Sequence, residues 1–180
     1  GDAKPKQRGG IIMEVIGKRR SIRSFRDQSV EAEKIERILQ AGMQAPSAHN
    51  SQPWEFLVVT DKEAKVNIAQ MSPYAGPAKA APVVIIVMAN LETAKAVNNL
   101  WWQQDVSACT QNMLLQIAAE ELGGVWLGFY PDEERAKKVQ TYFNLPDHIL
   151  PFSVIPFGYS AQENQFVDRF DKTKIHWEKY

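Results

Sequence analysis

Cysteine, histidine and net charge are all scarce in this 180-residue sequence. Cys109 is the only cysteine, so the chain forms no internal disulfide and supplies too few thiolates for a zinc cage. The three histidines, His49, His148 and His176, lie far apart and show no HExxH spacing. The 21 Lys and Arg residues balance 21 Asp and Glu residues. That balance argues against nucleic acid as a partner, because nucleic-acid binders usually carry net positive charge.

Common nucleotide and hydrolase motifs are missing as well. The sequence contains neither the GxGxxG of a dinucleotide-binding fold nor the GxxxxGKS/T of a nucleoside triphosphatase loop. It also lacks the GxSxG of a hydrolase nucleophile elbow. The longest apolar run, 83–89, is far shorter than the roughly 18 residues of a membrane span, and no membrane association is expected.

The first ten residues, GDAKPKQRGG, are polar and unpatterned, which predicts a disordered arm or a remnant of cloning. The expected location is the cytoplasm. Because the sequence does not begin with Met, the earlier removal of a signal peptide stays open.

The remaining composition is that of an ordinary globular protein, with 44% hydrophobic residues, and predicts one domain over 11–180. Hydrophobic spacing predicts helices over 11–18, 29–45, 61–71, 95–122 and 131–144, and strands over 54–60, 83–89, 125–130 and 152–159. The three prolines of 72–82 predict a loop, and the apolar side chains of the tail, 160–180, predict that it docks. The sum is an α+β fold whose sheet is covered by helices.

Three arginines and a serine gather at Arg19-Arg20-Ser21-Ile22-Arg23, directly after the first helix. Guanidinium groups donate forked, charge-assisted hydrogen bonds to phosphate oxygens, and a bound dianion would remove their mutual repulsion. The alternative is a solvated basic turn.

Two prolines bracket a polar run at 45–54, APSAHNSQPW, just before a strand. Such a rigid loop can present donors and acceptors to the polar edge of a heterocycle. It can equally be a connector whose polar groups satisfy its own turns.

Glycines surround and interrupt the strand in GGVWLGFYP, 123–131. A glycine inside a strand marks close approach by a ligand or another backbone, or a bulge. Arg169 stands alone between aromatic residues near the end of the chain, where a surface salt bridge is the simplest role.

Taken together and in this order, RRSIRSF, APSAHNSQPW, GGVWLG and DRFD resemble the nitroreductase family of FMN-dependent oxidoreductases, from about residue 11 to 180. The resemblance implies a central, mostly antiparallel sheet of four to five strands covered by helices. It also implies an intertwined homodimer with FMN bound where the two subunits meet.

The resemblance further implies which residues bind the cofactor. Arg19, Arg20, Ser21 and Arg23 match the family's Arg-Arg/His-Ser-x-Arg/Lys motif. Arg19, Ser21 and Arg169 would hold the FMN phosphate, and Arg23 would approach the ribityl chain or the pyrimidine edge. Four further matched positions would contact the flavin from the second subunit: Pro46, Ser47, Asn50 and Gln52. Leu127 and Gly128 match the strand whose backbone N–H groups face flavin N5 and O4. Larger family members carry an acidic residue where Leu127 stands.

The implied activity is transfer of electrons from NADH or NADPH through flavin N5 to a flat acceptor such as a nitroaromatic or quinone, in ping-pong order. No catalytic side chain and no metal are required, because the cofactor carries the hydride. Two alternatives stay open: a dehalogenase-like reductase on the same fold, and a flavin-binding protein without turnover. The sequence leaves open the choice of nicotinamide, the physiological acceptor and the role of Trp101 and Trp102, for which packing is the favoured role.

Overall fold

The computed structural model describes residues 12–180, so the expected arm over 1–10 lies outside the described residues. Its centre is an antiparallel sheet in the order β1–β2–β5–β3, with β4 also paired to β5. The strands are β1 Trp54–Val59, β2 Val83–Asn90, β3 Gly123–Gly124, β4 Leu127–Gly128 and β5 Ile149–Gly158. The expected α+β class with a mostly antiparallel sheet of four to five strands is confirmed.

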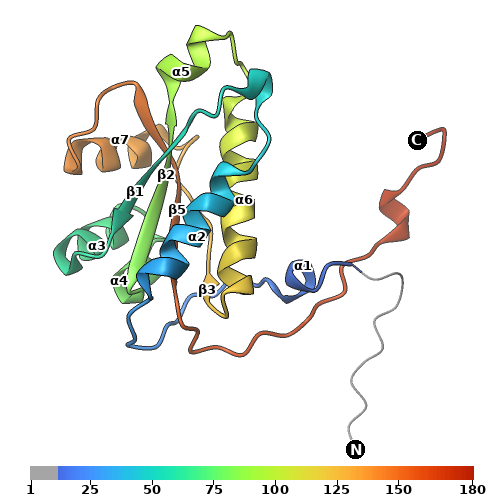
Figure 1. Ribbon diagram of the computed structural model, residues 1–180, viewed down its shortest axis with the longest axis horizontal. Coiled ribbons are helices and arrows are strands. Elements are labelled where there is room, and N and C mark those ends of the chain that lie inside the picture. The colour runs from blue at the N-terminus through green and yellow to red at the C-terminus, as the bar shows by residue number, and fades with distance from the viewer. Residues whose placement is uncertain (1–11) are drawn as a thin grey trace, which may run out of the picture.

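Helices cover both faces of the sheet (Figure 1). One layer consists of α2 Ala32–Met43 and α6 Trp102–Ala119, and the other of α3 Lys62–Ala69, α4 Pro77–Ala80 and α7 Glu133–Tyr142. The alternating side chains of β2 therefore pack in two cores: Ile85 faces α6, whereas Ile86 faces α3 and α7. None of the helices within 12–180 is long and apolar enough to cross a membrane.

The predicted helix over 95–122 is wrong in its extent, because it is two helices. A short α5, Leu91–Ala96, ends at a turn, and α6 begins only at Trp102. Asn98 adopts a left-handed backbone with φ of 54°, which no α-helix continues through. Asn90 caps α5 by accepting hydrogen bonds from the N–H groups of Glu92 and Thr93.

Three smaller expectations also need correction. Of the strand expected over 125–130, only β4 is formed, and β3 lies before the expected range; between the two, Val125 N–H reaches Pro156 O at 3.3 Å. The loop over 72–82 contains α4, which has Pro77 in its first turn. Glu31, not Ser29, precedes the first turn of α2 and makes no side-chain cap.

The tail after Tyr159 contacts the body of its own chain only in its first part, where Ala161 N–H donates to Ser24 O and Gln162 Oε1 accepts from Arg23 N–H. It passes α1, Glu14–Lys18, and then projects away from the sheet and its helices (Figure 1). Phe170 is 68% exposed and Trp177 is 81% exposed. Exposed apolar side chains of this size are typical of surfaces that contact another molecule.

Candidate functional site

The arginine motif lies beside β3, at the C-terminal end of α6. Ser21 forms a parallel bridge with Gly124, and Ile22 N–H donates to Gly124 O at 2.9 Å. On the other side, Gln162 Oε1 accepts from Arg23 N–H at 2.7 Å and from Ser24 N–H at 3.0 Å. The backbone of the motif is thus fixed between the sheet and the start of the tail.

Arg19 is the most constrained charge of this motif. It is half-buried and lines a crevice together with Leu114, Ile117 and Gly123. Burial, followed by the charges of Arg20 and Arg169, lowers the pKa of Arg19 from its ordinary value. The charge of Arg169, from the far end of the sequence, therefore acts on Arg19. Within residues 12–180, no carboxylate forms an ion pair with Arg19, Arg20 or Arg169.

Arg20 holds the tail rather than facing the crevice alone. Its Nε donates to Gln165 O at 2.7 Å, and its Nη2 lies 3.4 Å from the carbonyl oxygens of Gly17 and Val167. Phe166 packs against α1, with a ring carbon 3.0 Å from the position that a Cβ on Gly17 would occupy. These contacts fix the tail three residues before Arg169.

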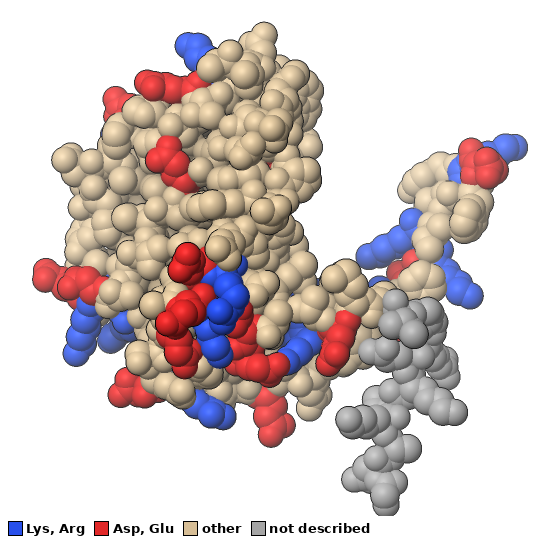
Figure 2. Space-filling view, viewed as in Figure 1, with Lys and Arg blue, Asp and Glu red and all other residues tan. Residues whose placement is uncertain are grey.

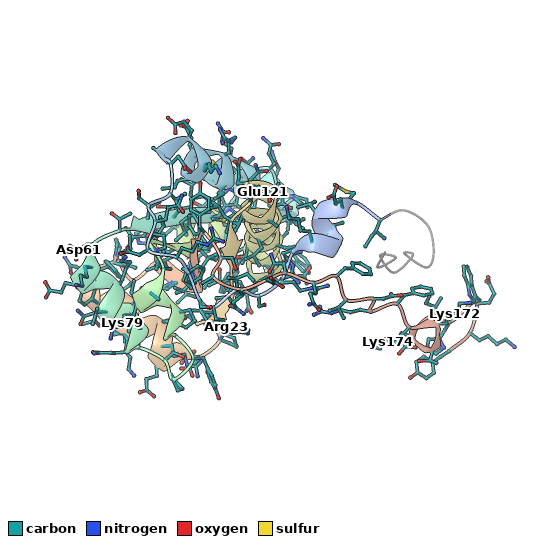
Figure 3. All side chains as sticks on the ribbon, turned by 90° about the horizontal axis from the view of Figure 1, so that it is seen from below. Arg23, Asp61, Lys79, Glu121, Lys172 and Lys174 are labelled. Carbon is teal, nitrogen blue, oxygen red and sulfur yellow. The ribbon has the colours of Figure 1, made fainter. Side chains whose placement is uncertain are left out.

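Arg23 is exposed on the body of the molecule. Figure 3 shows it on the globular part, whereas Lys172 and Lys174 lie far out on the projecting tail. The structure therefore brings Arg19, Arg20, Ser21 and Arg169 together, with Arg23 at their edge, and leaves the end of the tail outside this cluster.

Leu127 and Gly128 lie on β4, further along the same edge of the sheet, and pair with Val154 and Ser153 of β5. The Leu127 side chain is buried in the core on the α3 and α7 side. Gly128 is exposed, and no atom lies within 4 Å of the position that a Cβ would occupy there. At this point only backbone is available to a ligand.

The loop over 46–52 lies at the opposite, N-terminal end of α6. Ser47 Oγ accepts from Gln52 N–H at 3.0 Å, and Gln52 Nε2 donates to Asn50 Oδ1 at 2.9 Å. Pro46 and Ser47 line a hollow of about 370 Å³ beside Trp101 and Asp105. Ser47, Asn50 and Gln52 are thus brought together, and their side chains satisfy groups within their own loop.

The two groups of predicted residues do not meet within one chain. Arg19 lies against Ile117 of α6, whereas Ala48 binds Asp105 near its start. Twelve helical residues separate these positions along α6, or about 18 Å at 1.5 Å per residue. One chain therefore holds both halves of the expected site, but at opposite ends of one helix.

Asp105 and Asn99 are polar residues of this region that sequence reasoning missed. Both are buried, and Asn99 Nδ2 donates to Asp105 Oδ2 at 2.6 Å and to Ser51 Oγ at 2.7 Å. One sign was available in the sequence: Asp105 precedes Cys109 and Met113 by one and two helical turns, so it belongs to the buried stripe of α6. A carboxylate on such a stripe requires buried hydrogen-bond donors.

The two tryptophans at the start of α6 have different surroundings. Trp102 packs against Tyr130, with ring centroids 5.3 Å apart, and against Phe152. Trp101 is 47% exposed and lies beside His49, with centroids 6.2 Å apart. Trp102 is therefore a packing residue, and Trp101 forms part of the surface around the hollow.

Comparison with known proteins decides the family. The model of the nitroreductase family matches residues 16–79 and 72–159. The chain belongs to the nitroreductase family. Among its relatives, a Methanothermobacter thermautotrophicus protein named for NADH dehydrogenase or NAD(P)H nitroreductase activity is 42% identical over 169 residues, which cover 94% of this chain and 87% of that protein.

Solved structures of nitroreductases agree with the fold. A Clostridium acetobutylicum protein named as an NADH oxidase superposes with a TM-score of 0.89 at 48% identity, covering 93% of this chain and 100% of that one. A Desulfovibrio desulfuricans protein, named as a nitroreductase and solved in complex with FMN, has a TM-score of 0.78 at 33% identity, covering 92% and 95% of the two chains. The expected family, fold class and oxidoreductase class are confirmed.

Proposed function

We propose that this nitroreductase binds FMN between two copies of the chain and passes electrons from NADH or NADPH to a flat acceptor, such as a nitroaromatic or a quinone, in ping-pong order. The observation that carries this proposal is the position of half-buried Arg19, which lines a crevice with Arg20 and Gly124. Burial and the charges of Arg20 and Arg169 lower the pKa of Arg19. Positive groups that repel one another and have no carboxylate partner among residues 12–180 suit an anion.

The residues present fit the phosphate of FMN. Arg19 and Arg169 would donate charge-assisted hydrogen bonds to it, and the exposed hydroxyl of Ser21 would add a further donor. Arg20 would act by holding the tail that carries Arg169, since its donors face the carbonyl groups of Gln165 and Val167. Arg23 would neutralise charge along the ribityl chain or the pyrimidine edge.

The flat ring system would lie along the open edge at β4. The backbone from Gly124 to Gly128 spans at most about 13 Å, from four residues of extended chain, and leads away from the arginines. Because Gly128 has no side chain and open space beside it, a ring can approach its backbone closely. The backbone N–H groups of Leu127 and Gly128 would then orient the ring.

A second copy of the chain would complete the site. Asp105 is the only charged residue among the 18 of α6, and it is buried, so the solvent-facing side of this helix carries no charge. Figure 2 agrees: the surface over α6 is largely uncharged, and the densest group of charged side chains lies at the lower end of this face. If two α6 helices pack antiparallel, the partner's 46–52 loop reaches the arginines of the first chain.

The projecting tail supports the same assembly. Phe166, Phe170 and Trp177 are exposed on it. Ile12, which precedes α1, and Ile16 within α1 are exposed as well. A partner subunit would cover these apolar side chains and so stabilise the dimer. Pro46, Ser47, Asn50 and Gln52 would contact FMN from this partner.

Bound FMN supplies an electron-accepting ring that takes a hydride and later passes electrons on. The chain's own residues bind that cofactor, orient it, and favour its reduced form through positive charge near the pyrimidine edge. No side chain has to act as acid or nucleophile.

An absorbance spectrum before and after anaerobic NADPH tests this function. Purified protein mixed with FMN should retain about one FMN per chain, and NADH or NADPH should bleach its absorbance. Protein that takes up no FMN contradicts the proposal, and bound FMN that neither nicotinamide bleaches indicates a flavin-binding protein without turnover. A panel of nitroaromatics, quinones and halogenated phenols then separates a nitroreductase from a dehalogenase-like enzyme.

A further inference from the structure

Asp105 is a buried carboxylate whose bonds all lead to one loop. It is 5% exposed, and no cation pairs with it within residues 12–180. Its Oδ1 accepts from Ala48 N–H at 2.9 Å, and its Oδ2 accepts from Asn99 Nδ2 at 2.6 Å. Burying a carboxylate is costly even where hydrogen bonds compensate, so an apolar residue here would stabilise the core more.

Asn99 carries the connection from Asp105 to a second point of the loop. It is 4% exposed, its Oδ1 accepts from Trp101 N–H at 2.8 Å, and its Nδ2 also donates to Ser51 Oγ at 2.7 Å. The pair Asp105–Asn99 therefore holds the loop at Ala48 and at Ser51, on either side of His49 and Asn50.

The loop needs such anchors because its backbone is strained. His49, Asn50 and Gln52 have φ values of 54°, 50° and 48°, in the left-handed region that disfavours residues with a Cβ. Left-handed conformations of residues with a Cβ are sterically costly and persist where surrounding contacts enforce them. The two anchors flank His49 and Asn50, the second directly precedes Gln52, and both connect this part of the loop to the start of α6.

We propose that Asp105 and Asn99 are positioning residues that fix the 46–52 loop in the shape in which it contacts FMN of the partner chain. This inference rests on the proposed function. Neither side chain touches the cofactor; both act through the backbone of Ala48 and the hydroxyl of Ser51. The buried carboxylate keeps the loop ordered before FMN binds. The binding free energy is then not reduced by the entropy cost of ordering the loop.

A pair of reciprocal substitutions tests the connection. In D105N, the new amide group meets Asn99 Nδ2 or Ala48 N–H, so two donors face each other. In N99D, two carboxylates face each other. In the double variant D105N/N99D, Asn at 105 donates to Asp at 99, so the bond between the two side chains is restored in the reverse direction. The bond to Ser51 is restored as well, because its hydroxyl can rotate and donate to the new carboxylate.

A matched control lies on the other side of the sheet. Asp61 accepts from Ala64 N–H at 2.9 Å at the start of α3, as Asp105 does from Ala48 N–H. Asn caps a helix about as well as Asp does, so D61N should change neither stability nor cofactor affinity.

The measurements are FMN affinity by fluorescence titration, the visible circular dichroism of bound FMN and the thermal unfolding midpoint. We expect D105N and N99D each to weaken FMN binding at least tenfold and to alter the dichroism. The double variant should return within about threefold of the wild-type affinity.

Two outcomes would overturn different claims. If wild-type protein binds FMN and D105N binds it with unchanged affinity and dichroism, or if the double variant recovers neither, the positioning role is wrong and the proposed function stands. If wild-type protein binds no FMN, the proposed function is wrong and this inference falls with it. Hydrogen exchange of the Ala48 amide, measured without FMN, tests the loop directly. In a folded D105N variant this amide should lose protection while the core amides keep theirs, whereas an unfolded variant loses protection throughout.

Discussion

The Nε of Arg20 donates a hydrogen bond of 2.7 Å to the carbonyl oxygen of Gln165, 145 positions further along the chain. This bond ties the second residue of the arginine motif to the tail, just before Arg169. We therefore expect Arg20 to contribute to cofactor binding indirectly, through the place of the tail. The geometry of its guanidinium should matter more than its charge.

Replacing Arg20 tests this. R20A should weaken FMN binding by about 1 kcal/mol, roughly fivefold, and should accelerate tryptic cleavage within the tail. R20K keeps the charge but loses the forked donors, so it should behave like R20A. Wild-type affinity and wild-type cleavage in R20K would instead assign the role to charge alone.

Arg19 should bind the phosphate directly. R19A is expected to weaken FMN binding by about 1.5–3 kcal/mol, the range for a hydrogen bond to a charged group. Arg26 is an exposed arginine nearby that lies outside the motif, and R26A should leave affinity unchanged. Equal affinities of R19A and wild-type protein in the same titration would refute the phosphate assignment.

Gly123 leaves room for the residue at the centre of the arginine motif. A Cβ at Gly123 would stand 2.6 Å from Cγ1 of buried Ile22, whose β-branched side chain has little rotational freedom. G123A should therefore lower the free energy of unfolding by about 1–3 kcal/mol and also weaken FMN binding. Denaturant unfolding and titration check both effects.

Gly76 offers a control for that substitution. No atom lies within 4 Å of its Cβ position, so G76A should be neutral or slightly stabilising. A G123A variant as stable as G76A, with full FMN affinity, would show that Ile22 can shift without moving the arginines.

Glu120 makes folding stability depend on acid pH. Hydrogen bonds from Arg37 and Gln116 lower its pKa from an ordinary 4.5 to about 2, against an opposing effect of burial. Since the folded-state pKa is the lower one, the ionised group stabilises the fold above about pH 4.5. That stabilisation disappears as pH falls from 4.5 to 2.

E120Q should cost about 0.5–1 kcal/mol at pH 7, and its difference from wild-type protein should vanish near pH 2. Glu121 forms an exposed ion pair with Lys18, so E121Q should change stability by less than about 0.5 kcal/mol at any pH. Chemical denaturation of the three proteins between pH 2 and 7 makes the comparison. A pH-independent cost of E120Q would contradict the assignment.

Cys109 should be inert in the folded protein. It is fully buried between α2 and α6, and burial raises the pKa of its thiol to about 12. A thiol-reactive disulfide should label no cysteine in native protein at pH 8 and one in denaturant. Rapid labelling of native protein would show that the α2–α6 contact opens.

Local patterns in the sequence predict much of the sheet and its helices. The run at β2 and the Asp61 cap of α3 carry their own structural information, because a short, wholly apolar run and a helix cap each depend on only a few residues. The prediction of one helix over 95–122 rests on its apolar residues and gives too little weight to Asn98 and Asn99, a residue type that favours turns. Their role depends on Ser51 and Asp105, which lie elsewhere in the chain.

The candidate site was accessible from sequence only through its family resemblance. Nothing local to Arg19 encodes an approach by Arg169, and that approach depends on the path that Arg20 and Gln162 impose on the tail. The resemblance points to the loop residues Asn50 and Gln52, which match positions that contact the cofactor. It does not point to Asp105, which under our proposal acts only through the backbone of Ala48.

Because α6 separates the arginines from the 46–52 loop, cofactor loading and chain concentration are thermodynamically linked under the proposed assembly. Each bound FMN stabilises the dimer, and dissociation of the dimer weakens FMN binding in turn. Dilution alone would then dissociate the dimer and release FMN. A single chain could not hold the cofactor with both groups of residues, because the length of α6 keeps them apart.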